Sequence, residues 1–205
     1  MRARLLLAVI FALLTALPCS AQADVHVYLL KGGFGGVFST GLDDLAKKLG
    51  RRGHRTTVGS YSSYDRFADQ AIHLDRQGGG PIVIVGHSWG ADDAFAMAKR
   101  MADAGAPVAL IAAFGPTQIL TAPANVAYVI NFYQGDTQVR AGRGFRGTIA
   151  NVNLDRARGI DHFNIEDSNN LHARVIARIR SLTARSYVGR NIRQRRNDRD
   201  QPLAD

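Results

Sequence analysis

Two patterns of apolar and polar residues alternate along most of the chain. Short apolar runs predict strands at residues 25–30, 81–85, 108–114 and 126–132. A shorter segment at residues 55–61 and an alternating one at residues 148–154 predict two more, which makes six. Amphipathic stretches predict helices at residues 40–49, at 64–77, from 91 onward and at 165–183. Strands that are apolar throughout are typical of a parallel sheet covered on both faces. We therefore predict a single α/β domain, in which a mostly parallel sheet of about six strands lies between two layers of helices.

The segment Gly86-His87-Ser88-Trp89-Gly90 joins the apolar run 81–85 to the helix predicted from Ala91. A serine at such a turn is exposed above the end of the sheet, and the flanking glycines allow strand and helix to pass closely without a Cβ clash. Ser88 is therefore a candidate nucleophile. The alternative is an ordinary turn serine, because the G-x-S-x-G pattern by itself is common.

A serine hydroxyl needs a base within hydrogen-bond reach, and the base needs a group that orients it. In an open parallel sheet such residues gather at the carboxyl ends of the strands. Asp136 follows the run 126–132, and His162 follows the run 148–154. These positions make Asp136 the candidate acid and His162 the candidate base.

Alternatives remain for each of these roles. Asp155 and Asp161 are the other candidates for the acid, and a helix-capping or surface position is the alternative for His162. His87, inside the turn, is expected to pack or to orient the turn rather than to react. The remaining histidines lack H-x-H and H-E-x-x-H spacing, so no metal site is predicted.

With these residues in the order serine, aspartate, histidine, the chain resembles the α/β-hydrolase superfamily. The resemblance rests on G-H-S-x-G at residues 86–90, a G-D turn at Asp136 and D-H-F around His162, and it extends from the first predicted strand to the last helix. In size the chain is similar to small, lidless secreted lipases, esterases and cutinases. The resemblance implies a three-layer sandwich and acyl transfer to water, in which Ser88 attacks an ester carbonyl, His162 transfers the proton and Asp136 orients His162. It also implies no metal and no organic cofactor.

A glycine cluster, Gly32-Gly33-Phe34-Gly35-Gly36, follows the first predicted strand. An oxyanion needs fixed backbone N–H donors, one from the residue after the nucleophile and one from a loop after an early strand. The candidate donors are therefore Trp89 and either Gly33 or Phe34. Many members of the superfamily have His-Gly before the second donor, whereas this chain has Lys31-Gly32, so the choice stays open. The alternative for this loop is a tight glycine turn.

The N-terminal residues have the pattern of an export signal. Arg2 and Arg4 precede an apolar stretch at residues 5–17, and Ala21-Gln22-Ala23 matches a cleavage site. We therefore expect residues 1–23 to be removed and the product to be periplasmic or secreted.

The mature chain is expected to form one domain over residues 24–184. The single cysteine, Cys19, lies in the predicted signal, so disulfides and thiolate chemistry are not expected. The whole chain has a formal net charge of +9, and part of this surplus lies in residues 185–205, a basic segment expected to be disordered. Such a segment favours weak contact with an anionic membrane surface, and no nucleic-acid partner is expected.

Together these features predict an exported serine hydrolase that acts on carboxylic esters of small molecules or lipids. A thioesterase or an amidase would use the same three residues. Another alternative is a catalytically silent hydrolase fold that binds the cell envelope, because fold alone does not establish activity. Residues 115–125 are expected at most to form a small flap beside the site.

Overall fold

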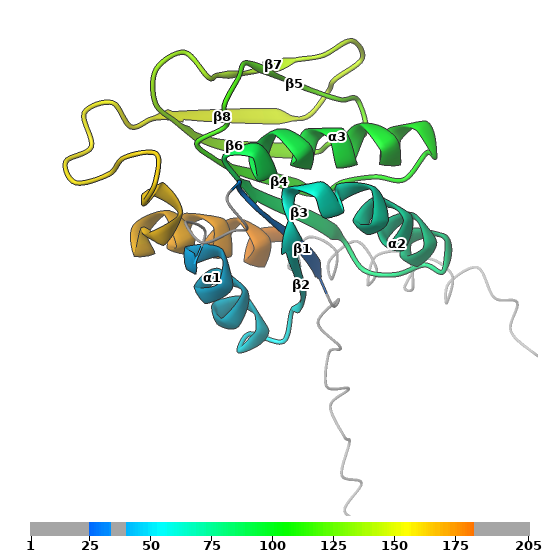
Figure 1. The fold of residues 1–205 in the computed structure, drawn as a ribbon. Helices are drawn as coiled ribbons and strands as arrows, with labels where there is room; N and C mark the ends of the chain where they lie inside the picture. The colour runs from blue at the N-terminus through cyan, green and yellow to red at the C-terminus, as the bar shows by residue number, and fades with distance from the viewer. Residues whose placement is uncertain (1–24, 34–39, 183–205) are drawn as a thin grey trace, which may run out of the picture.

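Six parallel strands form the central sheet of the protein (Figure 1). The fold is taken from a computed structural model, which describes residues 25–33 and 40–182. The strands lie in the order β2-β1-β3-β4-β6-β8, and every neighbouring pair is parallel. Their bounds are β1 (His26–Lys31), β2 (Arg55–Ser60), β3 (Ile82–His87), β4 (Leu110–Phe114), β6 (Tyr128–Tyr133) and β8 (Thr148–Asn153). All six predicted strands are confirmed, and their ends lie within two residues of the predicted ones.

Helices cover both faces of this sheet (Figure 1). α1 (Thr40–Gly50) and a final helix over residues 169–182 pack on one face, and α2 (Tyr64–Arg76) and α3 (Trp89–Asp103) pack on the other. Alternate residues of the inner strands belong to two separate buried apolar clusters, one under each layer of helices. The predicted three-layer α/β architecture is therefore confirmed.

The order of the strands reverses at β1. From β1 the chain passes to β2 on one side, and β3 then lies on the other side of β1. In open parallel sheets, ligands bind outside the carboxyl ends of the strands at such a switch point. Gly32 and Gly33 follow β1, and Ser88 follows β3. The topology therefore places the glycine loop and the candidate nucleophile at the same edge of the sheet.

A second, small sheet lies beside the main one. β5 (Leu120–Ala122) pairs in parallel with β7 (Val139–Ala141). The hydrophobic pattern does not predict these strands, because three residues are too few to show a period. Since β5 belongs to this sheet, segment 115–125 is partly built into the fold rather than being a separate flap.

The start of the last helix differs from the prediction. Residues Ile165–Asp167 form a 3₁₀ turn, η3, and Ser168 has extended backbone angles (φ −66°, ψ 112°). The helix begins only at residue 169, so the predicted start at Ile165 is wrong. Another 3₁₀ turn, η2 (Tyr61–Ser63), leads into α2.

Some expectations concern residues outside the described part of the chain. These are the export signal at residues 1–23, Phe34 as one of the two candidates for the second oxyanion donor, and the basic segment 185–205. Within residues 25–33 and 40–182, no helix combines the length and the apolarity that crossing a membrane requires.

Candidate active site

Ser88 occupies a strained turn between β3 and α3. Its backbone angles are φ 55° and ψ −125°, and among the described residues it is the one non-glycine residue with a positive φ. Its N–H donates to the carbonyl oxygen of Phe114 at 3.0 Å, and its own carbonyl oxygen accepts from the N–H of Ala91 at 2.8 Å. Strained residues of this kind cluster at functional sites, so the observed geometry supports Ser88 as a functional residue.

The glycines on both sides of Ser88 are required by close backbone contacts. A Cβ at Gly86 would overlap the carbonyl oxygen of Gly90, and a Cβ at Gly90 would overlap the carbonyl oxygen of Leu30. Strand β3, helix α3 and the end of β1 therefore approach one another through bare backbone. The close approach of these backbones is the reason for glycine at positions 86 and 90 that the sequence pattern suggests.

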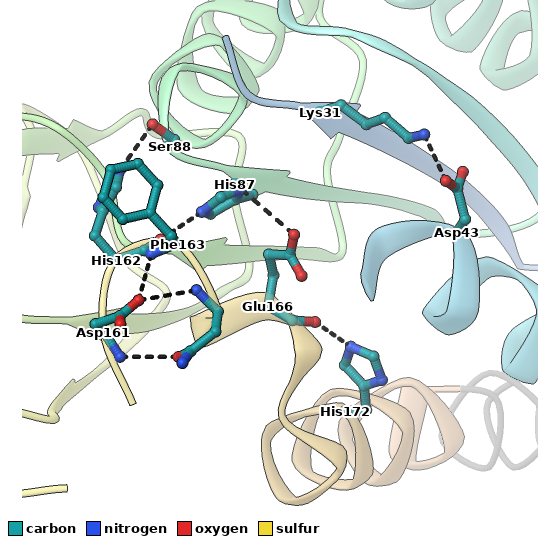
Figure 2. A network of polar contacts seen from close by, with 10 residues as sticks. Lys31, Asp43, His87, Ser88, Asp161, His162, Phe163, Glu166 and His172 are labelled. Atoms are coloured by element: carbon teal, nitrogen blue, oxygen red, sulfur yellow. Dashed lines mark hydrogen bonds and ion pairs between the residues drawn. The ribbon is translucent and has the colours of Figure 1, made fainter. Parts of the chain in front are cut away.

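His162 lies within hydrogen-bond distance of Ser88. Nε2 of His162 is 2.9 Å from Oγ of Ser88, although the two residues are 74 positions apart in the chain (Figure 2). A hydroxyl at this distance from an imidazole nitrogen can transfer its proton to the ring. The structure thus brings the predicted nucleophile and the predicted base together.

Hydrogen bonds within its own loop hold His162 in place. Oδ1 of Asp161 accepts the N–H groups of Phe163 at 2.8 Å and of Asn164 at 3.2 Å. Nδ2 of Asn164 donates to the carbonyl oxygen of Gly159 at 3.1 Å, which closes the turn. Asp161 therefore shapes the backbone beside His162 (Figure 2).

The predicted acid, Asp136, forms no hydrogen bond with His162 in the described part of the chain. Asp136 is exposed in the turn after β6, and in the described part of the chain no carboxylate forms a hydrogen bond with the His162 ring. A Cβ at Gly115 would lie 3.1 Å from Nδ1 of His162, so that side of the ring faces the loop after β4. The assignment of Asp136 as the acid stays a prediction.

The alternative acid Asp155 has a structural role in the same region. Oδ1 of Asp155 accepts the N–H of Gly135 at 2.8 Å, and Oδ2 accepts from Nδ2 of Asn153 at 2.8 Å. These hydrogen bonds lower the pKa of Asp155, the one from Gly135 most strongly. Asp155 thereby anchors the turn that carries Asp136.

Two of the three oxyanion candidates lie next to each other. Trp89 is the first residue of α3, and a Cβ at Gly33 would lie 2.8 Å from Cε3 and Cζ3 of its indole ring. Glycine at position 33 therefore lets the loop after β1 pack against Trp89. Phe34 is outside the described residues, so the choice of the second donor stays open.

An open pocket lies beside Trp89. Its volume is about 350 Å³, and its lining residues are Tyr61, Trp89, Asp92, Asp93, Thr117 and Gln118. The rings of Trp89 and Tyr61 meet edge to face, with centroids 5.4 Å apart. Asp92 accepts hydrogen bonds from the backbone and the hydroxyl of Thr117, which ties the start of segment 115–125 to α3. Burial, followed by the charges of Asp92 and Asp65, raises the pKa of Asp93 to about 6.

The sequence did not single out Glu166, which is fully buried behind the Ser88 turn. Its Oε1 lies 3.7 Å from Nδ1 of His87, the residue before Ser88. Burial is the largest of the causes that raise the pKa of Glu166 to about 8. A single buried glutamate in a short turn leaves no periodic signal, so only the three-dimensional structure identifies it.

No metal site is found among residues 25–33 and 40–182, because no three His, Cys, Asp or Glu side chains there are placed to hold an ion. No family model and no curated protein matches the chain. Among solved structures, the chain is similar to a protein from Xanthomonas campestris pv. campestris described as a "putative hydrolase of the alpha/beta superfamily". The two chains are 16% identical, the match covers 75% of this chain and 98% of that chain, and the TM-score is 0.43.

Proposed function

We propose that the protein is an exported serine hydrolase that cleaves carboxylic esters. The observation that carries the proposal is the 2.9 Å separation between Nε2 of His162 and Oγ of Ser88, at a turn where the serine itself is strained. A hydroxyl and an imidazole in this arrangement, at the carboxyl end of a central strand, are what acyl transfer requires. The export pattern of residues 1–23 supports the cellular location.

In the proposed reaction Oγ of Ser88 attacks the ester carbonyl while Nε2 of His162 accepts the hydroxyl proton. His162 then donates this proton to the leaving alcohol, and the acyl group stays on Ser88. A water molecule, deprotonated by His162, then attacks the acyl carbonyl; the acyl group leaves as the carboxylic acid, and His162 returns the proton to Oγ of Ser88. The N–H of Trp89 and a donor from the loop after β1 stabilise the oxyanion, and Asp136 supports the protonated His162.

The pocket beside Trp89 supports short esters as the first substrates to test. It is open, and it combines two aromatic rings with the carboxylates of Asp92 and Asp93. Such a lining offers little continuous apolar surface to a long acyl chain. Thioesters and amides use the same chemistry, so both belong in the substrate panel.

Covalent labelling tests the proposal directly. The chain from residue 24 onward should hydrolyse a short p-nitrophenyl ester and react with a fluorophosphonate at Ser88, as located by peptide mapping. Ser88→Ala should abolish both signals, because no other hydroxyl meets His162 among the described residues. Ser181→Ala, a change on the final helix, is the matched control and should retain both. Equal behaviour of the wild type and Ser88→Ala would contradict the proposal.

A catalytically silent, envelope-binding protein is the second candidate. Two observations favour it: the His162 ring makes no hydrogen bond with a carboxylate in the described part, and a basic hollow of about 730 Å³ lies between α1 and the final helix. The basic side chains that line this hollow are Lys48, Arg51, Arg52 and Arg180. A protein that is not labelled by the fluorophosphonate but sediments with anionic vesicles would fit this candidate instead.

A further inference from the structure

His87 connects the strand of the nucleophile to the loop of the base. It is the last residue of β3 and is 2% exposed. Its Nε2 lies 2.9 Å from the main-chain carbonyl oxygen of His162. Because a carbonyl oxygen only accepts hydrogen bonds, Nε2 of His87 must carry a hydrogen atom. The buried ring of His87, the residue before Ser88, thus binds the backbone of His162, whose own ring faces Ser88 (Figure 2).

The geometry excludes His87 itself as the base. Its Nε2 is engaged with the His162 carbonyl, and it is the Nε2 of His162 that faces Oγ of Ser88. The two imidazole rings lie side by side, with centroids 5.5 Å apart. A polar ring in this place is costly to bury unless its hydrogen bond is made. Its position is therefore better explained by the contact with His162 than by packing alone.

Glu166 faces the other nitrogen of the His87 ring. Oε1 of Glu166 lies 3.7 Å from Nδ1 of His87, and the glutamate is fully buried. The first turn of α1 packs directly against the carboxyl group, since a Cβ at Gly41 would overlap Oε2. Nε2 of His172, on the final helix, donates to the Glu166 carbonyl oxygen at 2.6 Å. Turn η3 is thereby fixed from both sides.

The charges around this pair favour uncharged side chains near neutral pH. Burial, followed by the nearby carboxylates of Asp167 and Asp43, raises the pKa of Glu166, and among the described residues neither oxygen of its carboxyl group has a hydrogen-bond partner. Asp43 is in turn paired with Lys31 of β1 at 2.5 Å. Burial is also the main cause that lowers the pKa of His87. The hydrogen bond with His162 and the charge of Asp167 oppose this effect, while the charge of His162 adds to it.

The charge of Glu166 decides where His87 carries its hydrogen. A neutral imidazole has one hydrogen, on either Nε2 or Nδ1. An uncharged Glu166 leaves it on Nε2, where the His162 carbonyl needs it. An ionised carboxylate facing Nδ1 attracts the hydrogen there, and the bare Nε2 would then repel the carbonyl oxygen of His162.

We infer that His87 is a positioning residue, which holds the main chain of the His162 loop so that His162 meets Ser88, and that uncharged Glu166 keeps the hydrogen of His87 on Nε2. The inference rests on the proposed function, because the quantity it controls is the alignment of the base with the nucleophile. It goes beyond that function by assigning roles to two buried residues that do not touch the substrate.

Three variants test the inference. His87→Leu should lower kcat for a short p-nitrophenyl ester by about 10- to 100-fold, because a displaced base transfers the proton poorly. KM should stay within about twofold, since His87 does not line the pocket beside Trp89. His87→Gln, whose side-chain amide can donate to the same carbonyl, should recover most of the rate. His73→Leu, a change of an exposed histidine on α2, should leave both constants unchanged.

The pH profile separates positioning from simple structural support. In the wild type, kcat should decline above about pH 8 as Glu166 ionises, after subtraction of spontaneous hydrolysis. Glu166→Gln cannot ionise, so its kcat should stay level through pH 9. The inference is overturned by a His87→Leu kcat equal to the wild type, by equal losses in His87→Gln and His87→Leu, or by the same alkaline profile in the wild type and Glu166→Gln.

Amide hydrogen exchange tests the positioning role of His87 independently of hydrolytic activity, so a failure of this role and a failure of the proposed function can be told apart. If the wild type neither hydrolyses esters nor reacts with fluorophosphonate, the proposed function fails. Amide exchange in residues 157–164 should still be faster in His87→Leu than in His87→Gln if His87 holds the loop. Equal exchange in the two variants would overturn the positioning role itself. Should His87→Leu fail to fold, Glu166→Gln and His87→Gln still decide the outcome.

Discussion

Ser88 shows how a strained residue is kept in place by its surroundings. A non-glycine residue at positive φ costs on the order of 1–3 kcal/mol. The strain is offset by hydrogen bonds on both sides of the peptide, from its N–H to Phe114 and from Ala91 to its carbonyl oxygen. The turn is also possible only because Gly86 and Gly90 leave room for neighbouring backbone. At the scale of single residues, the geometry of the candidate nucleophile thus requires that positions 86 and 90 carry no side chain.

The first prediction concerns Gly90. Gly90→Ala should destabilise the protein by about 3 kcal/mol, because the new Cβ would overlap the Leu30 carbonyl oxygen and force β1 and α3 apart. The free energy of unfolding from urea denaturation measures this loss. Gly50→Ala is the matched control: no atom lies within 4 Å of its new Cβ, so stability should stay the same or rise slightly. Equal stabilities of the two variants would contradict the close approach seen at Gly90.

At the scale of elements, the backbone of the turn after β6 is well anchored, although the side chain of Asp136, the candidate acid, is not. Asp155 binds the N–H of Gly135, and Nδ2 of Asn131, inside β6, donates to the carbonyl oxygen of Thr137 at 2.9 Å. The backbone on both sides of Asp136 is therefore held by side chains, one from β6 and one from the residues after β8. Within the described residues no partner engages the Asp136 carboxylate, so a side-chain rotation toward His162 would break no hydrogen bond.

The second prediction tests Asp136 as the acid. If the carboxylate supports the protonated His162 during the reaction, Asp136→Asn should lower kcat by about 10²-fold or more with little change in KM. Asp161→Asn is a useful comparison, because an amide oxygen can still accept the two N–H groups of the His162 loop. Its kcat should fall much less. Steady-state kinetics on a short ester measure both, and an unchanged kcat in Asp136→Asn would leave Ser88 and His162 acting without this acid.

At the scale of the whole molecule, most of the fold could be predicted and part of the site could not. Four of the six strands follow from apolar runs and the other two from a shorter and an alternating segment, and Ser88 and His162 follow from their positions after two of the predicted strands. Contacts between side chains at the edge of the sheet leave no comparable pattern in the sequence. Whether Asp136 touches His162 depends on rotamers of an exposed turn, and the burial of Glu166 depends on how α1, β3 and η3 pack together. Neither property is contained in local periodicity.

Glu166 also makes the stability of the whole protein depend on pH. Its pKa is raised to about 8 in the folded state from an ordinary value of 4.5, so the folded protein holds one more proton than the unfolded chain between these limits. Stability from this group is therefore fully present below about pH 4.5 and is lost as the pH rises toward 8. The effect of His87 has the opposite sign, because its pKa is lowered and protonation in acid opposes folding.

The titration of His87 is common to the wild type and to Glu166→Gln, so the difference between the two proteins measures the contribution of Glu166. From pH 6.5 to 8.5 the wild type should lose roughly 2 kcal/mol of unfolding free energy relative to Glu166→Gln. The loss is about 1.4 kcal/mol for each pH unit until the pH reaches the pKa of Glu166 in the folded state, and it levels off above that pH. Urea denaturation of both proteins at several pH values measures the difference. A Gln variant whose stability runs parallel to the wild type across this range would mean that Glu166 is already ionised in the fold, and a charged Glu166 could not keep the His87 hydrogen on Nε2.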